Sequence, residues 1–211
     1  MNVSHCMQRA PVTVVPEARL ADARQIMDEC GFGILLVATK EGHLDGFLTR
    51  AFLNSVTDWD RLVGDACFEA KFAVAPGDTL EKAALVLLSN QLVLLPVVEK
   101  DRLVGIVTQG EVLRGMALGL GVGLEAIRIA ALIRPESGDL YRLLHVLEKH
   151  GVKLISVIRG RNGAKREQVI LRVQCVADRE ALFRDLDGVL QEPVVDAELA
   201  VGPDLQERSE A

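Results

Sequence analysis

Two stretches of this chain repeat each other at an interval of about sixty residues. Gly46-Phe47-Leu48-Thr49 recurs as Gly105-Ile106-Val107-Thr108, 59 positions later. The match extends upstream, where Val14–Leu20 aligns with Val74–Leu80. A repeat of this length is about one supersecondary unit, and two copies normally pack against each other. The sequence therefore predicts a paired module, followed by an unrelated segment.

Each copy is expected to fold as β-α-β-β-α, because short apolar runs alternate with helical spacings. In the first copy, 1–57, we expect strands at 11–15, 34–38 and 44–48, a helix ending at Gly31, and a helix capped by Thr49. In the second, 58–119, we expect strands at 72–74, 93–99 and 103–107, a helix at 79–89, and a helix after Thr108. Glycine-rich residues 120–125 are expected to form a linker.

The segment 126–200 has a different order, strand, helix, strand, strand, helix, strand. Two apolar strands flank Asn162-Gly163, a dipeptide that favours a tight hairpin turn. This is the order of a ferredoxin-like βαββαβ sandwich. The polar tail 201–211 is expected to be disordered. The sequence therefore predicts an α+β protein with a duplicated module and one further domain.

Composition argues against several function classes. The net charge is −6 and the isoelectric point is about 5.3, whereas a protein that binds nucleic acid needs a basic face. The basic hairpin around Arg159 and Arg166 has no interleaved aromatic residue, so it is interpreted as a solvated turn. No apolar run approaches the ~18 residues of a membrane span.

Cysteine and histidine usage indicates neither disulfides nor a metal centre. Cys6, Cys30, Cys67 and Cys175 form no C-x-x-C pair and are interpreted as reduced thiols. The four histidines are scattered, so we expect no metal site. The N-terminus lacks the basic start and apolar core of a signal peptide. A cytoplasmic location is expected.

The repeated motif is glycine, two apolar residues and threonine, with an acidic residue three positions later in the second copy. On these residues, 1–119 resembles a pair of CBS domains, repeats that sense adenine-containing ligands. A threonine at a strand-to-helix junction lies beside backbone N–H groups that favour anions. The resemblance implies that Thr108 and Glu111 bind the ribose, whereas Phe52 stands at the acidic position after Thr49 and cannot. The alternative is that both threonines serve only as helix N-caps.

The resemblance also implies a segment that flanks the adenine. The two candidates are Ala70-Lys71-Phe72 and Arg9-Ala10-Pro11-Val12, and the sequence does not assign either to a cleft. The predicted nucleotide-binding residues are therefore Arg9, Ala10, Val12, Thr49, Ala70, Lys71, Phe72, Thr108 and Glu111.

Basic residues for a phosphate are scarce. Many nucleotide-binding CBS domains have basic residues before the middle strand, where this chain has Ile34-Leu35 and Val93-Leu94. The remaining candidates are Arg9, Arg50 and Lys71. An uncharged adenosine-like ligand, or no ligand, stays open beside a nucleotide.

Residues 126–200 resemble an ACT domain, a small amino-acid-sensing module that also pairs with a second copy. The resemblance rests on the loop 135–140 and the helix exit 150–155, although Ser137 and Lys153 depart from the family pattern. It implies effector-binding residues Gly138, Asp139 and Leu140. The alternative is a domain that serves only as a dimer surface.

Two CBS repeats followed by an ACT domain resemble the acetoin-utilisation B-type proteins. The resemblance implies a homodimeric regulatory protein that binds an adenine metabolite and an amino acid, with no required cofactor. A ligand-free interaction scaffold is the second hypothesis. An enzyme is the third, because no spacing pairs a nucleophile with a base and no phosphate-binding glycine loop is present. Ligand identity, downstream target and dimer versus tetramer stay open.

Overall fold

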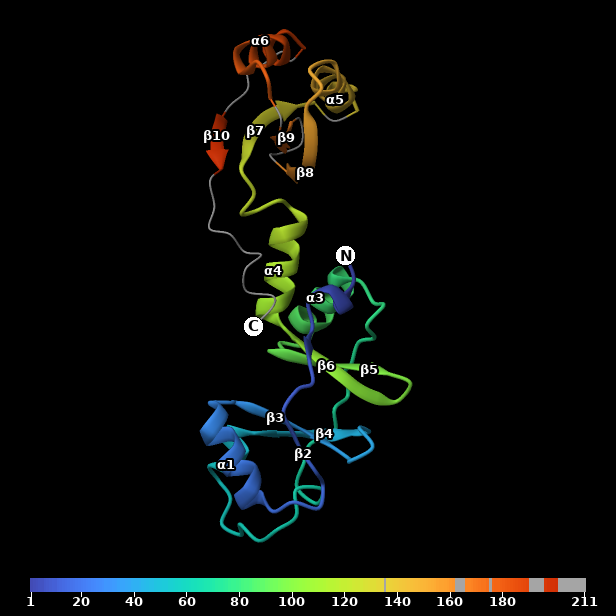
Figure 1. Cartoon of the computed structure of the whole chain (residues 1–211), viewed down its shortest axis with the longest axis vertical. Helices are drawn as coiled ribbons and strands as arrows, with labels where there is room; N and C mark the ends of the chain where they lie inside the picture. Colours follow the sequence, from blue (N-terminus) through green and yellow to red (C-terminus); the bar gives the residue numbers. More distant parts are fainter. Residues whose placement is uncertain (135, 162–165, 175, 190–195, 201–211) are drawn as a thin grey trace. The chain divides into compact units, whose positions relative to one another are not determined.

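The computed structural model describes residues 1–134, 136–161, 166–174, 176–189 and 196–200 (Figure 1). The chain divides into two compact units, Met1–Gly115 and Met116–Ala211. The expected Asn162-Gly163 turn, Cys175 and the tail 201–211 lie outside the described residues.

The first repeat is a three-stranded sheet with two helices. Its elements are β2 (Thr13–Val14), α1 (Leu20–Cys30), β3 (Ile34–Ala38), β4 (Leu44–Thr49) and α2 (Arg50–Leu53). Strand β3 lies in the middle, parallel to β2 and antiparallel to β4. Helix α1 buries Leu20, Ala23 and Met27, which share one face at helical spacing. It ends at Gly31, whose left-handed φ of 71° suits glycine.

The second repeat copies this order with one difference. Its elements are α3 (Leu80–Ser89), β5 (Leu94–Glu99), β6 (Arg102–Thr108) and α4 (Gln109–Gly119). The strand expected at 72–74 is wrong, because only Val74 forms an isolated parallel bridge, to Val97. Phe72 is 41% exposed, so just one residue of the three is buried against the sheet.

The N-terminal segment of each repeat pairs with the other repeat. Strand β1 (Gln8–Arg9) is antiparallel to β6, and Gln8 lies opposite Ile106. Likewise Phe68, in the N-terminal segment of the second repeat, bridges to Phe47 of the first. The two N-terminal segments are therefore exchanged between the repeats.

The repeated glycine makes this exchange sterically feasible. A Cβ atom on Gly105 would lie 2.6 Å from the carbonyl oxygen of Gln8, and one on Gly46 would lie closer still to that of Phe68. Real Cβ atoms do not approach oxygen so closely, so any side chain here must displace the exchanged segment.

The second unit has the predicted βαββαβ order. Its elements are α5 (Asp139–Lys149), α6 (Arg179–Val189) and the strands β7 (Ala126–Ile133), β8 (Lys153–Arg161), β9 (Glu167–Gln174) and β10 (Asp196–Ala200). The strand order is β10-β7-β9-β8, and all three pairings are antiparallel. This is the split βαβ topology. Alternate residues of β7 and β9 join the apolar faces of α5 and α6 in one core.

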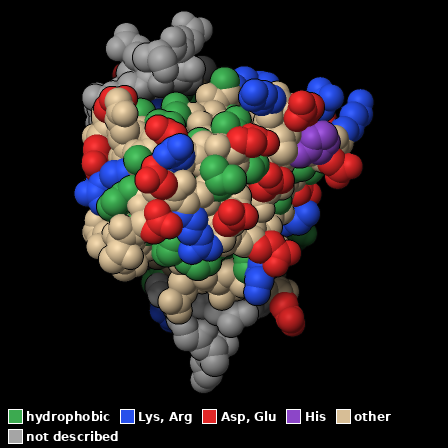
Figure 2. Space-filling model, turned by 90° about the horizontal axis from the view of Figure 1, so that it is seen from below, with side chains coloured by type: hydrophobic (Ala, Val, Ile, Leu, Met, Phe, Trp, Pro, Cys, Tyr) green, Lys and Arg blue, Asp and Glu red, His purple; other side chains and the backbone are tan. Residues whose placement is uncertain are grey.

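Charges of both signs share the molecular surface. The face seen from below in Figure 2 shows acidic and basic side chains interspersed. Ion pairs of the first repeat include Arg19 with Asp60 and Arg24 with Asp28. Within the described part of the chain, no helix combines the length and apolarity needed to cross a membrane.

Candidate functional site

A cavity of about 450 Å³ opens beside the N-terminus of α4 in the first unit. Backbone and side chains from both repeats form its wall: Gln8–Val12, Gly31–Ile34, Leu36, Val93, Leu94, Ile106 and Thr108. Most of these residues are apolar and a few are polar, as in typical small-molecule sites. We call this cavity the Thr108 cleft.

One of the two candidate flanking segments, 9–12, lines the Thr108 cleft. Arg9, Ala10 and Val12 line it together with Thr108, because β1 pairs with the strand that ends at Thr108. The exchange of the N-terminal segments therefore brings these predicted residues into one site.

The other candidate segment belongs to a smaller cavity of about 80 Å³. Ala70, Lys71 and Phe72 line it with Phe47 and the apolar 92–94 stretch. Thr49 lines neither of the two cavities. Seven of the nine predicted residues are thus divided between two unequal cavities, and Thr49 and Glu111 line neither.

Glu111 is hydrogen-bonded at the inner edge of the Thr108 cleft. The backbone N–H of Thr108 donates to Glu111 Oε2 at 3.0 Å, and the Thr108 hydroxyl donates to the same oxygen. Gln8 Nε2 donates to Glu111 Oε1 at 2.7 Å. Glu111 does not itself line the cavity, but both of its partners do. Its position is that of the acidic residue in a capping box.

These hydrogen bonds keep the Glu111 carboxylate ionised. Partial burial acts to raise the pKa of Glu111, but the hydrogen bonds from Thr108 and Gln8 outweigh it and lower the pKa below its ordinary value. A charged acceptor is therefore held beside the cleft.

The equivalent place in the first repeat is filled by aromatic rings. Thr49 Oγ1 accepts a hydrogen bond from the N–H of Phe52 at 3.1 Å, so Thr49 is an N-cap. The ring of Phe52 meets that of Phe68 edge-on, with centroids 5.4 Å apart. Phe68 occupies the place that Gln8 has in the second repeat. An aromatic pair thus replaces the Gln8–Glu111 pair.

Arg50 has a structural role that the sequence did not indicate. Its Nε donates to the carbonyl of Phe32 at 3.1 Å, and its Nη2 donates to that of Met27 at 2.6 Å. Its Nη1 forms an ion pair with Asp28. Arg50 therefore satisfies the carbonyl groups at the end of α1 and fixes the loop that lines the Thr108 cleft.

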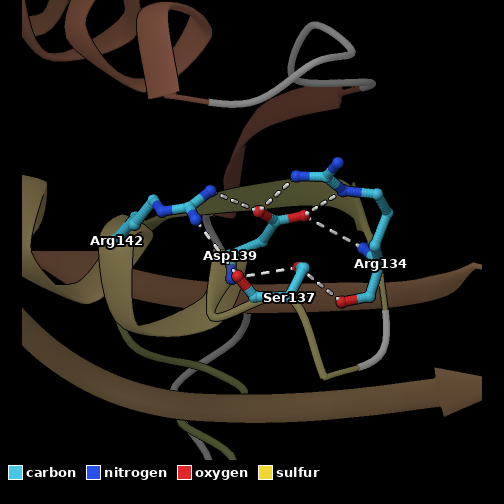
Figure 3. Close-up of polar contacts among 4 residues, drawn as sticks. All are labelled: Arg134, Ser137, Asp139 and Arg142. Carbon is cyan, nitrogen blue, oxygen red and sulfur yellow. Dashed lines mark hydrogen bonds and ion pairs between the residues drawn. The ribbon is translucent and has the colours of Figure 1, made fainter.

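The predicted effector loop of the second unit contains a buried carboxylate (Figure 3). Asp139 is 4% exposed, and its Oδ2 accepts from the N–H and Nε of Arg134 at 3.1 and 3.2 Å. Its Oδ1 accepts from Arg142 Nη1 at 2.9 Å. The hydrogen bonds from Arg134 drive the pKa of Asp139 far below its ordinary value. Gly138 precedes it with a left-handed φ of 76°, and Leu140 packs on the core.

Among the described residues, no group of three or more His, Cys, Asp or Glu side chains could hold a metal ion. Cys6, Cys30 and Cys67 are free thiols. Burial raises the pKa of the Cys6 thiol, and the nearby Glu111 adds to this effect.

Comparison with known proteins identifies the first unit. The family model of the CBS domain matches residues 3–51 and 63–118, one match for each repeat. The first unit is a CBS domain pair. The exchanged strands and the Thr108 cleft are therefore features of this pair.

Solved structures that resemble the CBS pair include the following three, each over little more than half of this chain. CBSX2 in complex with AMP is 26% identical, with a TM-score of 0.52 over 56% of this chain and 96% of that one. A CBS domain pair/ACT domain protein from Thermotoga maritima is also 26% identical, with a TM-score of 0.52 over 57% and 99%. A putative acetoin utilization protein from Vibrio cholerae shares the fold at 24% identity and a TM-score of 0.51, over 56% and 90%.

One curated relative is a choline transport ATP-binding protein of Bacillus subtilis, OpuBA. It is 30% identical over 108 residues, which are 51% of this chain and 28% of that protein. The match thus spans little more than a quarter of the relative.

Proposed function

We propose that this protein is a regulatory ligand sensor whose CBS pair binds an adenine-containing metabolite in the Thr108 cleft. The observation that carries the proposal is the meeting of Arg9–Val12 with Thr108 around one cavity of about 450 Å³. The similarity to CBSX2, which binds AMP, supports the ligand class. A sensing role is favoured over catalysis, because CBS pairs are generally regulatory modules.

The chemistry of the cleft suits an adenosine. Apolar residues from both repeats offer flat contact to a base, and Glu111 offers an ionised acceptor for ribose hydroxyls. In this proposal a ribose hydroxyl displaces Gln8 as the donor to Glu111 Oε1. Ligand binding would then release Gln8, which lies on the exchanged strand β1. This release is the proposed signal.

The proposal is tested by calorimetric titration of the full chain with adenosine and AMP. Glu111→Gln removes the charge at nearly constant size, and we expect it to weaken binding at least tenfold. Thr49→Val is the matched control, because it removes the equivalent helix cap without touching the cleft. The proposal is refuted if neither adenosine nor AMP binds. It is also refuted if the wild-type chain and Glu111→Gln bind them with equal affinity.

For the second unit, we propose an ACT domain in an arrangement of the acetoin-utilisation B type, acting in a cytoplasmic homodimer. The βαββαβ order supports this proposal. An amino-acid effector would be expected at Gly138–Leu140. Asp139, however, already takes the donors of Arg134 and Arg142, and this favours a second candidate, a domain that only pairs with its copy. A thermal-shift screen of the amino acids separates the two candidates. A melting temperature that no amino acid changes would favour the domain that only pairs with its copy.

A further inference from the structure

We propose that the Thr108 cleft accepts a nucleoside or nucleoside monophosphate and rejects di- and triphosphates, with Arg9 as its phosphate-binding residue. This inference rests on the proposed function and specifies its ligand class. It follows from the number of basic side chains and free N–H donors in the cleft that can bind phosphate oxygens.

Arg9 is the only basic residue among the described residues that line the cleft. It lies on β1 opposite Gly105, next to Gln8. Its side chain is exposed, and it can swing towards a ligand at little cost. One guanidinium matches one phosphate group, which carries about two negative charges, through paired hydrogen bonds.

The other two basic candidates are not available to this ligand. The Arg50 guanidinium is held by two carbonyl groups at the end of α1 and by Asp28. Its counterpart in the second repeat is the neutral Gln109, which donates to the carbonyl of Leu92 at 2.9 Å. Lys71 lines the smaller cavity.

The N-terminus of α4 cannot replace a second cation. Helix N-termini usually attract anions through unpaired N–H groups. Here the N–H of Gln109 donates to Val93 at 3.2 Å, and that of Gly110 donates to Thr108 Oγ1 at 3.1 Å. The N–H of Thr108 is taken by the Glu111 carboxylate, which adds a negative charge at this end. A β- or γ-phosphate would therefore be repelled by the Glu111 carboxylate, with no second cation or free N–H group among the described residues at this helix end to compensate.

The test is calorimetric titration of the full chain with adenosine, AMP, ADP and ATP at matched ionic strength, without magnesium. We expect adenosine and AMP to bind within tenfold of each other, and ATP at least tenfold more weakly than AMP. Arg9→Gln should weaken AMP about tenfold and change adenosine less than twofold, as expected for loss of one charge-assisted contact. Arg9→Lys should retain most AMP binding.

Arg114→Gln supplies the matched control, because it removes the same charge from α4 outside the cleft lining. ATP binding as tight as AMP binding overturns the inference and leaves the proposed function intact. Unchanged AMP affinity in Arg9→Gln overturns the role of Arg9. If none of the four compounds binds, adenosine included, the proposed function itself fails.

Discussion

Replacing Gly105 by alanine would insert a methyl group between β6 and the exchanged strand β1. The added Cβ would lie 2.6 Å from the carbonyl oxygen of Gln8, about 1 Å inside an ordinary carbon–oxygen contact. That oxygen belongs to backbone, so it cannot swing away as a side chain would. Strand β1 must therefore move as a unit.

The size of the effect follows from what β1 contributes. Overpacking of this kind costs about 1–3 kcal/mol. Moving β1 also strains its short pairing with β6 and the Gln8–Glu111 hydrogen bond, each worth about 1 kcal/mol. We expect Gly105→Ala to lower the free energy of unfolding by about 2–4 kcal/mol. At about 4 °C per kcal/mol for a domain of this size, the melting temperature falls by about 8–16 °C.

The assay uses the single tryptophan of the chain. Trp59 lies in the first unit, so its fluorescence during urea unfolding reports that unit alone. Gly77→Ala is the matched control, because its Cβ meets nothing within 4 Å and its φ is not left-handed. Equal urea midpoints for Gly105→Ala and Gly77→Ala would refute the close exchange of segments.

Three further substitutions test the hydrogen bonds to Asp139 and the contact between the Phe52 and Phe68 rings. Asp139→Asn should cost about 2 kcal/mol at pH 6. Because the folded-state pKa of Asp139 is depressed, the wild-type advantage is complete above the unfolded pKa of about 4 and fades as pH falls below it, which urea unfolding followed by circular dichroism at pH 6 and 3 would show. Phe52→Glu and Phe68→Gln should each destabilise the first repeat, measured by Trp59 fluorescence. The double variant should lose at least about 0.5–1.5 kcal/mol less than the sum, since the ring contact can be lost only once and the two introduced polar side chains can hydrogen-bond to each other. Strict additivity would contradict the pair.

The elements predicted from local patterns are confirmed where they depend on local physics. The apolar run 34–38 is β3, and Thr49 caps α2 as its spacing predicted. The exchange of segments was not predicted, because Gln8 and Ile106 are far apart in sequence and β1 has only two residues. A signal was nevertheless present. Glycine at the same point of both repeated strands indicates close approach of another backbone.

The candidate sites differ in how much the sequence could reveal. Thr108 and Glu111 were found through their motif spacing, yet their neighbour Gln8 was missed because it comes from a distant segment. The hydrogen bonds from Arg134 and Arg142 to Asp139 were also not predicted. Its Arg142 partner lies three residues along the same helix, a spacing that favours ion pairs and was visible in the sequence.

The exchange of segments explains how a duplicated chain can acquire two different strand-to-helix junctions, one after Thr49 and one after Thr108. The residue three positions after each threonine contacts a residue from the N-terminal segment of the other repeat, so the two partners must be chemically compatible. Glu111 facing Gln8 is a hydrogen-bonded pair, and Phe52 facing Phe68 is an apolar one. A mixed pair with Glu111 would leave its half-buried carboxylate against a ring without that hydrogen-bond partner, which costs about 1–3 kcal/mol. The two junctions therefore differ by a matched pair of residues, and converting one type of junction into the other requires both members to change together.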